Sequence, residues 1–494
     1  MTTGDVEISI LDGGGSVVVP SSSVQPVLGT SSSGTAGQVV ASRNPNTIAG
    51  IFGAGPLVED AAMSIAKGAT VLAVKLPSAT AGAATAVTST ALGGTSVVTV
   101  TGTPTDTAFV KMKVIVGGTI ASAGSRVQVS YDAGRTYGPV IALGTANTLV
   151  LDRIGVSFAF AAGTLVAGAT FTFGTTEPLG DAAGVLGALS ALQASPYALT
   201  GWGAPISLAG VVVTGALAGT INGYVNTLAT GKLFTRMIGS ARDASGPAAY
   251  GGTAETEATW TSAVLADFGA ADCKRITVGA GHYNMPLQIP SAVAGVPLMR
   301  RPFSWSLASR QTQIPIQRHA GRVRDGSLLD IVVDPVNDPN DGFVYHDERL
   351  NPTLDVGRFA TARTRIKKQG YYCVNPNLMS ATGSVYTLLP LGLVMDAACG
   401  IVYDVGQNDI NEDIRLNRNG TIFENEAKAI ESAMRIALQQ QLVNKNALSD
   451  ANVSVDRGSN VRNDKKVNVA VSIFSRGYLL EADISIGFAS DNGT

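Results

Sequence analysis

The sequence contains few charged residues. Asp, Glu, Lys and Arg make up 15% of its 494 residues, against about 25% in typical soluble domains. The formal net charge of −2 leaves no basic excess for binding nucleic acid. Because the cores of protein interfaces are depleted in charge, the shortage indicates either a large core or a surface covered by protein partners. The hydrophobic content of 45% excludes a disordered chain.

Cysteine and histidine are scarce as well, with three of each. The cysteines are far apart and odd in number, so they do not form a disulfide framework. No histidine lies close to another, or to a cysteine, at the spacing of metal ligands. We therefore expect no zinc site and no locally encoded Cys–His catalytic pair. The residues are Cys273, Cys373, Cys399, His282, His319 and His346.

Two kinds of hydrophobic segment are missing. No stretch of about 18 uninterrupted apolar residues predicts a membrane-spanning helix. The amino terminus, MTTGDVEISI, lacks the basic and then apolar pattern of a secretory signal. We expect a protein that is made in the cytosol and does not insert into a membrane.

The motif GAG occurs at Gly53–Gly55 and at Gly279–Gly281. The second copy follows a predicted strand, where a dinucleotide-binding loop would lie. It lacks the third glycine of that fingerprint, and Pro286 opposes an immediate helix. We interpret both copies as turn glycines and expect no bound cofactor.

An acidic segment follows in the second half of the chain. Calcium is conceivable there, but Pro339 falls where the EF-hand spacing, counted back from Gly342, requires a ligand. A loop rich in Pro, Asn and Asp explains the composition without a metal, so we expect none. The acidic residues are Asp334, Asp338, Asp341, Asp347 and Glu348.

The segment SYDAGRTYG, residues 130–138, resembles the Asp-box of sialidases and other β proteins. That resemblance implies a hairpin-stabilising turn and not glycosidase activity. Asp132 would cap the turn, Gly134 would take the left-handed backbone conformation, and Tyr137 would pack on the surrounding strands.

Composition and periodicity divide the chain into α/β, all-β and α+β parts. Short strands rich in Thr, Val and Ala recur at roughly ten-residue spacing between residues 80 and 176, flanked by helix–strand alternation. We expect a multidomain α+β or α/β fold with helix-covered mixed sheets, an inserted all-β module and extended, strand-forming terminal arms. The expected parts are an N-terminal arm (1–20), the first part of an α/β core (21–79), the inserted β-rich module (80–176), the second part of the core (177–350), a C-terminal α+β domain (351–474) and a C-terminal strand arm (475–494).

A long helix is predicted near the carboxyl end. Thr421 and Glu424 have the spacing of a capping box. Glu424–Lys428 and Glu431–Arg435 have the i,i+4 spacing of ion pairs. The apolar face of the helix, which we expect to pack on a neighbouring sheet, consists of Ile430, Met434, Ala437 and Leu438.

Both ends of the chain alternate strictly between apolar and other residues, which predicts strands with one buried face. Near the amino end, the glycines after Asp12 either turn a local hairpin or form a flexible joint behind the first strand. The alternating apolar residues are Val6, Ile8 and Ile10 at one end, and Val467, Val469, Val471, Ile473, Leu480, Ala482, Ile484, Ile486 and Phe488 at the other.

The order of segments resembles that of contractile tail sheath proteins of bacteriophages and related injection systems. The first matching segments are VQPVLGTSSSGTAGQ and GIFGAGPLVEDAA, and RRPFSWSLASR follows in the middle of the chain. The carboxyl end continues with NEAKAIESAMRIALQQQL, NVSV, KVNVAVSIF and YLLEADISIGFA. The resemblance covers roughly four-fifths of the chain and leaves out the β module.

This resemblance implies a structural subunit and not an enzyme. Such subunits stack as hexameric rings around a tail tube and contract to drive the tube through the host envelope. The implied partners are further copies of the chain, the tail tube protein, and baseplate and tail terminator proteins, within a virion tail that is assembled in the host cytoplasm. The module at residues 80–176 would face outward.

The resemblance also assigns the exchange of β-strands between subunits to the chain ends. It leaves open which neighbour receives which arm, and whether residues 467–474 or the last strand is the donor. The implied residues are Val6, Ile8, Ile10, Val467, Val469, Val471, Ile473, Leu480, Ile484, Ile486 and Phe488.

Two other classes of protein compete with a sheath subunit. The Asp-box and the Thr-rich strands favour an adhesive or carbohydrate-binding protein. The α/β part favours a dinucleotide-dependent enzyme, although its glycine motif is incomplete.

Overall fold

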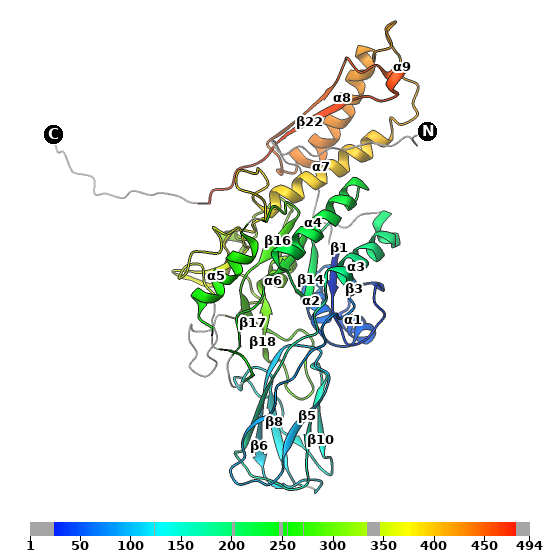
Figure 1. The fold of residues 1–494 in the computed structure, drawn as a ribbon. Coiled ribbons are helices and arrows are strands. Elements are labelled where there is room, and N and C mark those ends of the chain that lie inside the picture. The colour runs from blue at the N-terminus through cyan, green and yellow to red at the C-terminus, as the bar shows by residue number, and fades with distance from the viewer. Residues whose placement is uncertain are drawn as a thin grey trace, which may run out of the picture.

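The computed structural model describes residues 24–122, 124–199, 203–246, 250–253, 255–269, 271–332 and 346–480. The fold is mixed α+β with several sheets, as the sequence predicts. In Figure 1 the molecule is elongated, with strands β5, β6, β8 and β10 at one end and helices α7 and α8 at the other.

A six-stranded sheet forms the centre of the molecule, with the strand order β16-β15-β14-β1-β3-β2. All neighbours are parallel except β2, which runs antiparallel to β3. Nearly all residues of β1, β3, β14, β15 and β16 are buried, as expected for a parallel sheet that is covered on both faces. Their bounds are Val24–Gly29 (β1), Val39–Ser42 (β2), Thr70–Lys75 (β3), Ile206–Val212 (β14), Met237–Ser240 (β15) and Ile276–Gly279 (β16).

Helices cover both faces of this sheet. On β3, Leu72 and Val74 pack with α3, α4 and α5, whereas Val71 packs with α1 and α2 on the opposite face. Helix α6 contacts α2 on that second face. The bounds are Pro45–Phe52 (α1), Pro56–Ala66 (α2), Ala182–Ala194 (α3), Gly215–Thr230 (α4), Glu257–Phe268 (α5) and Phe303–Gln313 (α6), with a 3-10 turn at Pro196–Leu199.

The strands between β3 and α3 pair with one another, and we call residues 80–176 the β module. The strand orders are β4-β13-β6-β8-β9, β10-β11-β5 and β12-β7. Alternating side chains such as Val110, Met112 and Phe158 fill the space between the sheets. The bounds are Thr88–Thr90 (β4), Val98–Gly102 (β5), Ala108–Val116 (β6), Gly118–Thr119 (β7), Arg126–Ser130 (β8), Ile141–Ala142 (β9), Thr148–Leu151 (β10), Val156–Phe160 (β11), Thr164–Leu165 (β12) and Thr170–Thr175 (β13).

The segment resembling an Asp-box forms the predicted turn after β8. The Asp132 carboxylate accepts a hydrogen bond from Thr136 N at 2.9 Å, and Ser130 Oγ accepts one from Gly134 N at 2.8 Å. Gly134 has a φ of 93°, the left-handed conformation that glycine adopts without strain. Tyr137 is partly buried.

One hairpin of the central domain enters the β module. It consists of β17, His282–Pro286, and β18, Leu298–Pro302. The loop between these strands contributes Leu287 and Ala294 to the apolar cluster inside the module, and the start of β18 contributes Met299. We call residues 287–299 the plug loop.

Two aspartates of the β module fix the plug loop through its backbone. Asp152 Oδ2 accepts a hydrogen bond from Ala292 N at 2.7 Å, and Asp132 Oδ2 accepts one from Leu298 N at 3.2 Å. Asp132 therefore closes its own turn and holds the neighbouring loop at the same time.

A buried ion pair lies at the same junction. Arg301 of β18 donates to Asp106 of the module, with 2.7 Å between Nη2 and Oδ2, and the two side chains are 3% and 1% exposed. Glu59 and Glu177 lie close enough to influence this pair. Loss of solvent, reinforced by the charge of Asp106, raises the pKa of Glu177 to about 8, so Glu177 is largely protonated at neutral pH.

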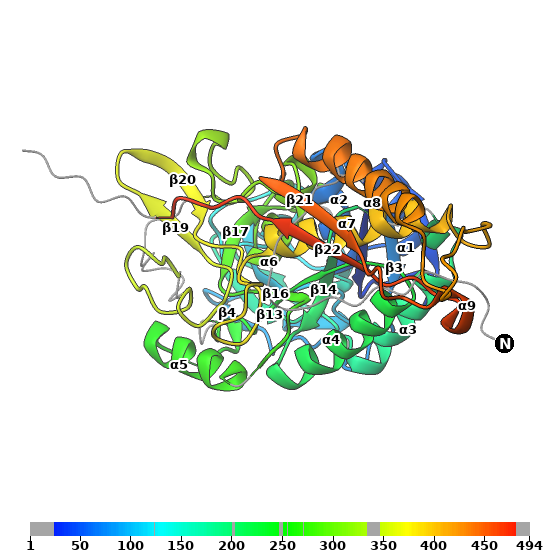
Figure 2. The same ribbon diagram turned by 90° about the horizontal axis from the view of Figure 1, so that it is seen from above.

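The C-terminal third adds a second layer of elements. It contains β19 (Ala362–Arg365), β20 (Lys368–Cys373), α7 (Leu389–Gln407), α8 (Glu424–Leu438), a π-helical turn (Gln439–Val443), β21 (Asp450–Val455), α9 (Val461–Asp464) and β22 (Val469–Phe474), after a 3-10 turn at Val323–Asp325. In both ribbon views, α7, α8 and the β21–β22 hairpin lie together (Figures 1 and 2).

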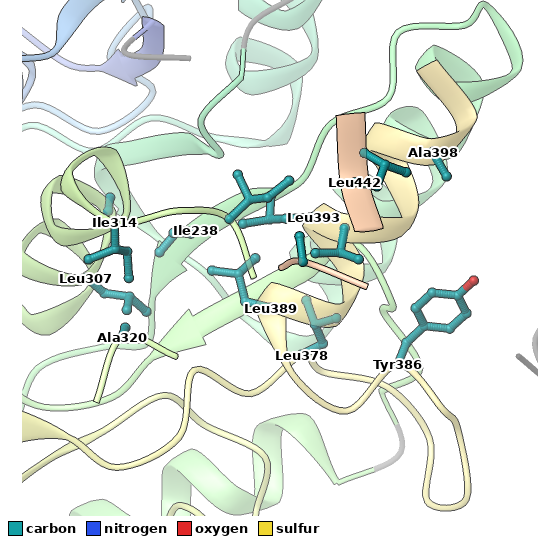
Figure 3. Close-up of a cluster of buried hydrophobic side chains, with 14 of the residues drawn as sticks. Ile238, Leu307, Ile314, Ala320, Leu378, Tyr386, Leu389, Leu393, Ala398 and Leu442 are labelled. Carbon is teal, nitrogen blue, oxygen red and sulfur yellow. The ribbon is translucent and has the colours of Figure 1, made fainter. Parts of the chain in front are cut away.

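Helix α7 joins this part to the central domain. Its residues Leu389 and Leu393 pack in one apolar cluster with Ile238 of the sheet and Leu307 of α6 (Figure 3). By length and composition alone α7 is apolar enough to span a membrane, but 67% of its most apolar window is buried inside the protein. This is the packing of a core helix.

The junction of the β module generates a prediction about pH. The raised pKa of Glu177 means that the folded protein retains a proton that the unfolded chain releases above about pH 4.5. The free energy of unfolding should therefore fall between about pH 5 and about pH 8, by at most about 1.4 kcal/mol per pH unit for this one group. Glu177→Gln removes the ionisation, and thermal unfolding should show the variant gaining stability over the wild type as the pH rises. If the stabilities of the wild type and Glu177→Gln changed equally with pH, the raised pKa of Glu177 would be contradicted.

Candidate functional site

The C-terminal hairpin is the site toward which the sequence points. Strands β21 and β22 pair antiparallel from Asp450–Phe474 to Val455–Val469 and form a separate two-stranded sheet. Its buried side chains pack on α8, whose apolar face consists of Ile430, Met434 and Leu438 as predicted. Of the predicted exchange residues, Val469, Val471 and Ile473 lie in β22 and pair with β21 of the same chain, and Val467 lies two residues before this strand.

The other predicted exchange residues are only partly covered by the structure. Leu480 is 61% exposed, after Leu479 at 86%. Val6, Ile8, Ile10, Ile484, Ile486 and Phe488 lie outside the described residues.

The chain leaves the hairpin along a fixed path. Tyr478 Oη donates a hydrogen bond to Gln317 O at 2.6 Å, and its ring lies 5.7 Å from that of His319. Two residues earlier, Arg476 Nη1 donates to Asn446 O at 2.7 Å. The terminal segment therefore begins at a defined point on the subunit, immediately before the two exposed leucines.

A cluster of charged side chains lies beside β21. Glu431 of α8 accepts a hydrogen bond from Val455 N at 2.7 Å, and Arg457 Nη1 donates to Val455 O at 2.7 Å. Arg457 also pairs with Glu424 at 3.0 Å and with Glu431. The Arg457 guanidinium and the Val455 N–H lower the pKa of Glu431 to about 2. We call Glu431 and Arg457 the β21 cap.

Two details of the predicted helix differ in the structure. Helix α8 begins at Glu424 after Phe423, which forms no side-chain cap, and Thr421 Oγ1 donates to Asn419 instead. The capping box is therefore wrong, because the helix begins three residues after Thr421, which does not occupy the N-cap position. The Glu424–Lys428 pair is confirmed at 3.3 Å. Glu431 pairs instead with Arg457, which follows β21, and this contact between α8 and the hairpin could not be predicted from i,i+4 spacing.

Buried ion pairs attach α7 to the central sheet. Asp396 lies between two arginines, 2.8 Å from Arg236 Nε and 2.9 Å from Arg275 Nη1, and all three side chains are nearly inaccessible. Arg236 and Arg275 directly precede β15 and β16. Gly392, one turn before Asp396, gives the Arg236 guanidinium room, because a Cβ atom there would overlap it. Sequence analysis missed this site because its three members are far apart in the chain.

The residues with metal-binding or catalytic potential are used structurally. His346 lies 2.8 Å from Glu257 and 3.2 Å from Glu348. Although burial opposes a charged ring, the hydrogen bonds to these carboxylates raise the pKa of His346. Asp347 accepts hydrogen bonds from Arg349 N and Thr364 N, which fits a loop role. Asp334, Asp338 and Asp341 lie outside the described residues.

Other candidate groups are also engaged in packing. Within the described ranges, no group of three or more His, Cys, Asp or Glu residues has metal-binding geometry. Burial raises the pKa of Cys273 to about 11 and of Cys399 to about 12, and Cys373 is buried as well. Gly279 ends β16 against Ser304, and Gly281, with a φ of 92°, turns the chain into β17. Gly281 is therefore a turn glycine, as interpreted, whereas Gly279 belongs to β16.

No protein-family model and no curated protein matches the chain. Among solved structures it resembles the sheath tail protein of Listeria innocua, with 13% identity over 94% of this chain and 93% of the other and a TM-score of 0.45. It also resembles the sheath tail protein of Desulfitobacterium hafniense, with 9% identity over 96% and 100% of the two chains and a TM-score of 0.44. A chain of the anti-feeding prophage baseplate aligns with 11% identity over 64% and 76%, with a TM-score of 0.40.

The first two structures are sheath tail proteins, the family whose segment order the sequence resembles. The identities and TM-scores are low, so we base the function of this chain on its own residues.

The attachment of α7 can be tested by substitution. Asp396→Ala would leave the Arg236 and Arg275 guanidinium groups buried without a carboxylate, and we expect the free energy of unfolding to fall by about 3–5 kcal/mol. The control is Asp404→Ala, on the exposed side of the same helix, where we expect a change within about 0.5 kcal/mol. Urea denaturation measures both, and equal losses would show that the buried carboxylate contributes nothing specific.

Proposed function

We propose that the chain is a structural subunit of a contractile tail sheath. In this proposal it polymerises as stacked hexameric rings around a tail tube and contracts to drive the tube through the host envelope. Its partners are further copies of itself, the tail tube protein, and baseplate and tail terminator proteins. It belongs to a virion tail that is assembled in the host cytoplasm, and it neither catalyses a reaction nor binds nucleic acid directly.

The observation that carries this proposal is the two-stranded β21–β22 sheet at one end of the molecule. A two-stranded sheet is marginal by itself, and its edges pair readily with extended segments of other chains. The same chain has alternating apolar segments at both ends, at residues 6–10 and 480–488. Such a subunit has both the segment that could be donated to a neighbour and the sheet that could accept one.

Strand exchange would give a connection that is strong and deformable. A strand of about six residues makes roughly four to six backbone hydrogen bonds, each worth about 0.5–1.5 kcal/mol net. Such tethers would keep the lattice connected while the larger domains slide between two packings. The energy of contraction would then reside in subunit contacts that differ between these packings.

The β module would face away from the tube. It lies at the end of the molecule opposite to the C-terminal hairpin (Figure 1). Contacts through the hairpin would therefore leave the module free to project outward. The parts proposed for assembly are the arms at residues 1–20 and 475–494 and the C-terminal domain at residues 351–474.

An adhesive or carbohydrate-binding protein is the alternative function, because the Asp-box turn is present in the β module. The polar groups of that turn, however, bind within the protein: Asp132 accepts from both Thr136 and Leu298. This use favours an architectural role for the turn. Binding of the full-length protein to a glycan array would support the alternative.

Removal of the arms tests the proposal. Deletion of residues 1–15 or of residues 479–494 takes away no buried described residue, since Leu479 and Leu480 are exposed. We expect both truncated proteins to fold, with unchanged circular dichroism, and to form no tubes in negative-stain electron microscopy. The full-length protein should form tubes with a wide lumen.

A shorter deletion provides the matched control. Removal of residues 491–494 alone keeps the alternating segment that ends at Phe488, so tubes should still form. Tubes from the chain lacking residues 479–494 would exclude the tether role of this arm.

A further inference from the structure

The β19–β20 hairpin brings positive charges close to one another. Arg363 and Arg365 occupy alternate positions of β19, so they lie on one face of the hairpin. Lys368 is directly opposite Arg365 in the register, and like charges at opposed positions destabilise a pair of strands. Loss of solvent, together with the charge of Arg363, lowers the pKa of Arg365. The hairpin therefore contains a repulsion between its own side chains.

A neighbouring loop adds to this positive charge. Leu328 N donates a hydrogen bond to Tyr371 O at 2.8 Å, which brings the segment containing Arg324 close to β20. Asp325 of the same segment pairs with Arg322 at 2.9 Å. In the described part of the chain, no carboxylate forms an ion pair with a group of five residues that we call the basic face. These residues are Arg324, Arg363, Arg365, Lys367 and Lys368.

The end of helix α7 carries the opposite charge. A helix has partial negative charge at its C-terminus, where carboxylates are unfavourable and cations are stabilising. The last turn of α7 nevertheless contains Asp404 and no basic residue, and three more acidic residues follow before Ile414. Loss of solvent, reinforced by the charge of Glu412, raises the pKa of Asp409. We call Asp404, Asp409, Glu412 and Asp413 the acidic tip.

The acidic tip is not neutralised by its neighbours in the chain. Arg415 lies over the ring of Phe423, 4.4 Å from the ring centroid. Among the described residues, no lysine or arginine forms an ion pair with the four carboxylates. Asp404, Glu412 and Asp413 are exposed. Both surfaces therefore hold like charges whose repulsion a partner of the opposite charge would relieve.

The two charged surfaces lie on opposite sides of the molecule. Figure 2 shows the β19–β20 hairpin at one side and α9 at the other. The segment that follows α7 reaches α9, because Gly420 O accepts a hydrogen bond from Arg462 N at 3.4 Å. The acidic tip spans the end of α7 and the start of this segment, so it is directed away from the basic face. The two surfaces of one subunit cannot bind each other.

We propose that the basic face of one copy binds the acidic tip of a neighbouring copy. This inference rests on the proposed polymerisation. The formal net charge of the chain is only −2, so the positive and negative surfaces are separated within a nearly neutral subunit and can compensate each other between copies. Charge complementarity of this kind fixes the orientation of partners more than their affinity.

The placement of the two surfaces determines the kind of assembly. A contact between two different surfaces of the same chain is heterologous, and its repetition gives a ring when the rotation closes and a helix when it does not. Both arrangements use each basic face and each acidic tip once. The contact therefore gives every subunit one neighbour on each side, as the proposed ring of subunits requires.

Charge reversal on each surface tests the proposal. The basic-face variant carries Arg324→Glu and Lys368→Glu, and the acidic-tip variant carries Asp404→Lys and Asp413→Lys, all at exposed positions. Lys368→Glu places a carboxylate opposite Arg365, and Asp404→Lys places a cation at a helix C-terminus. We therefore expect both variants to unfold at the same temperature as the wild type or higher. Each alone should need at least about tenfold more protein to form tubes.

Mixing the two variants provides the decisive comparison. In an equimolar mixture, a reversed surface of one variant meets the reversed surface's original partner charge on the other, and a hexameric ring can alternate the two variants. We expect the mixture, and the protein carrying all four substitutions, to form tubes at the wild-type concentration in negative-stain electron microscopy. The control is Lys113→Glu with Arg126→Glu, the same change of charge at exposed positions of the β module, which should not affect assembly.

The outcomes separate this proposal from the proposed function. If the unmodified protein forms no tubes, the proposed function fails. If it forms tubes and both reversed variants form them equally well, this proposal is wrong. Loss of tubes without rescue in the mixture would show that the two surfaces bind different partners, and would also overturn it.

Crosslinking of the unmodified protein tests the same contact without substitutions. A carbodiimide joins a lysine amine to a carboxylate when the two are in contact. In assembled tubes, mass spectrometry should find Lys367 or Lys368 joined to the acidic tip, and the free subunit should lack this product. If these lysines are joined only to other positions of neighbouring copies, the acidic tip is not the partner of the basic face.

Discussion

A strand at the edge of a sheet has backbone groups whose partners must come from outside the sheet, and the C-terminal hairpin meets this requirement differently on its two sides. Beside β21, Glu431 and Arg457 supply partners from within the subunit. Beside β22, the described part of the chain supplies none. The hairpin is therefore asymmetric, with one edge occupied at Val455 by side chains of the same subunit. The proposed role of the chain ends depends on this two-stranded sheet, which is too small to be stable by itself.

A hairpin that connects subunits has to transmit force to the rest of its own subunit. The path runs from β22 through β21 to α8 and α7, and then through Asp396 to the arginines that precede β15 and β16. Desolvated pairs of this kind are costly to break, because separation leaves charges without partners in a low-dielectric interior. The close approach of Arg236 to Gly392 makes the attachment sterically specific as well. A load applied at β22 would thus reach the central sheet through a rigid connection.

Sequence periodicity predicted those helices and strands in which buried and exposed residues alternate regularly along one segment. The alternation at Val467–Ile473 predicted β22, and the helical spacing of Ile430, Met434 and Leu438 predicted the buried face of α8. The Asp-box turn and the glycine turn at Gly281 were also predicted, because their chemistry is local. Contacts between distant segments could not be predicted: the partner of Glu431, the ion pairs of Asp396 and the anchor of Tyr478 all depend on tertiary packing. The capping box failed because helix α8 begins at Glu424, so that Thr421 lies outside the N-cap position.

Because of the plug loop, the interior of the β module is built from two separate stretches of the sequence. Leu287, Ala294 and Met299 complete its interior from a distant stretch of sequence. A recombination event or a chimera that exchanged residues 80–176 alone would combine a new module with the original plug loop. The side chains of that loop would then fit poorly among the new strands, and poor packing destabilises a close-packed interior. A new module grafted onto this chain should therefore carry a matching plug loop. Sequence changes in residues 80–176 and in residues 287–299 should accordingly occur together.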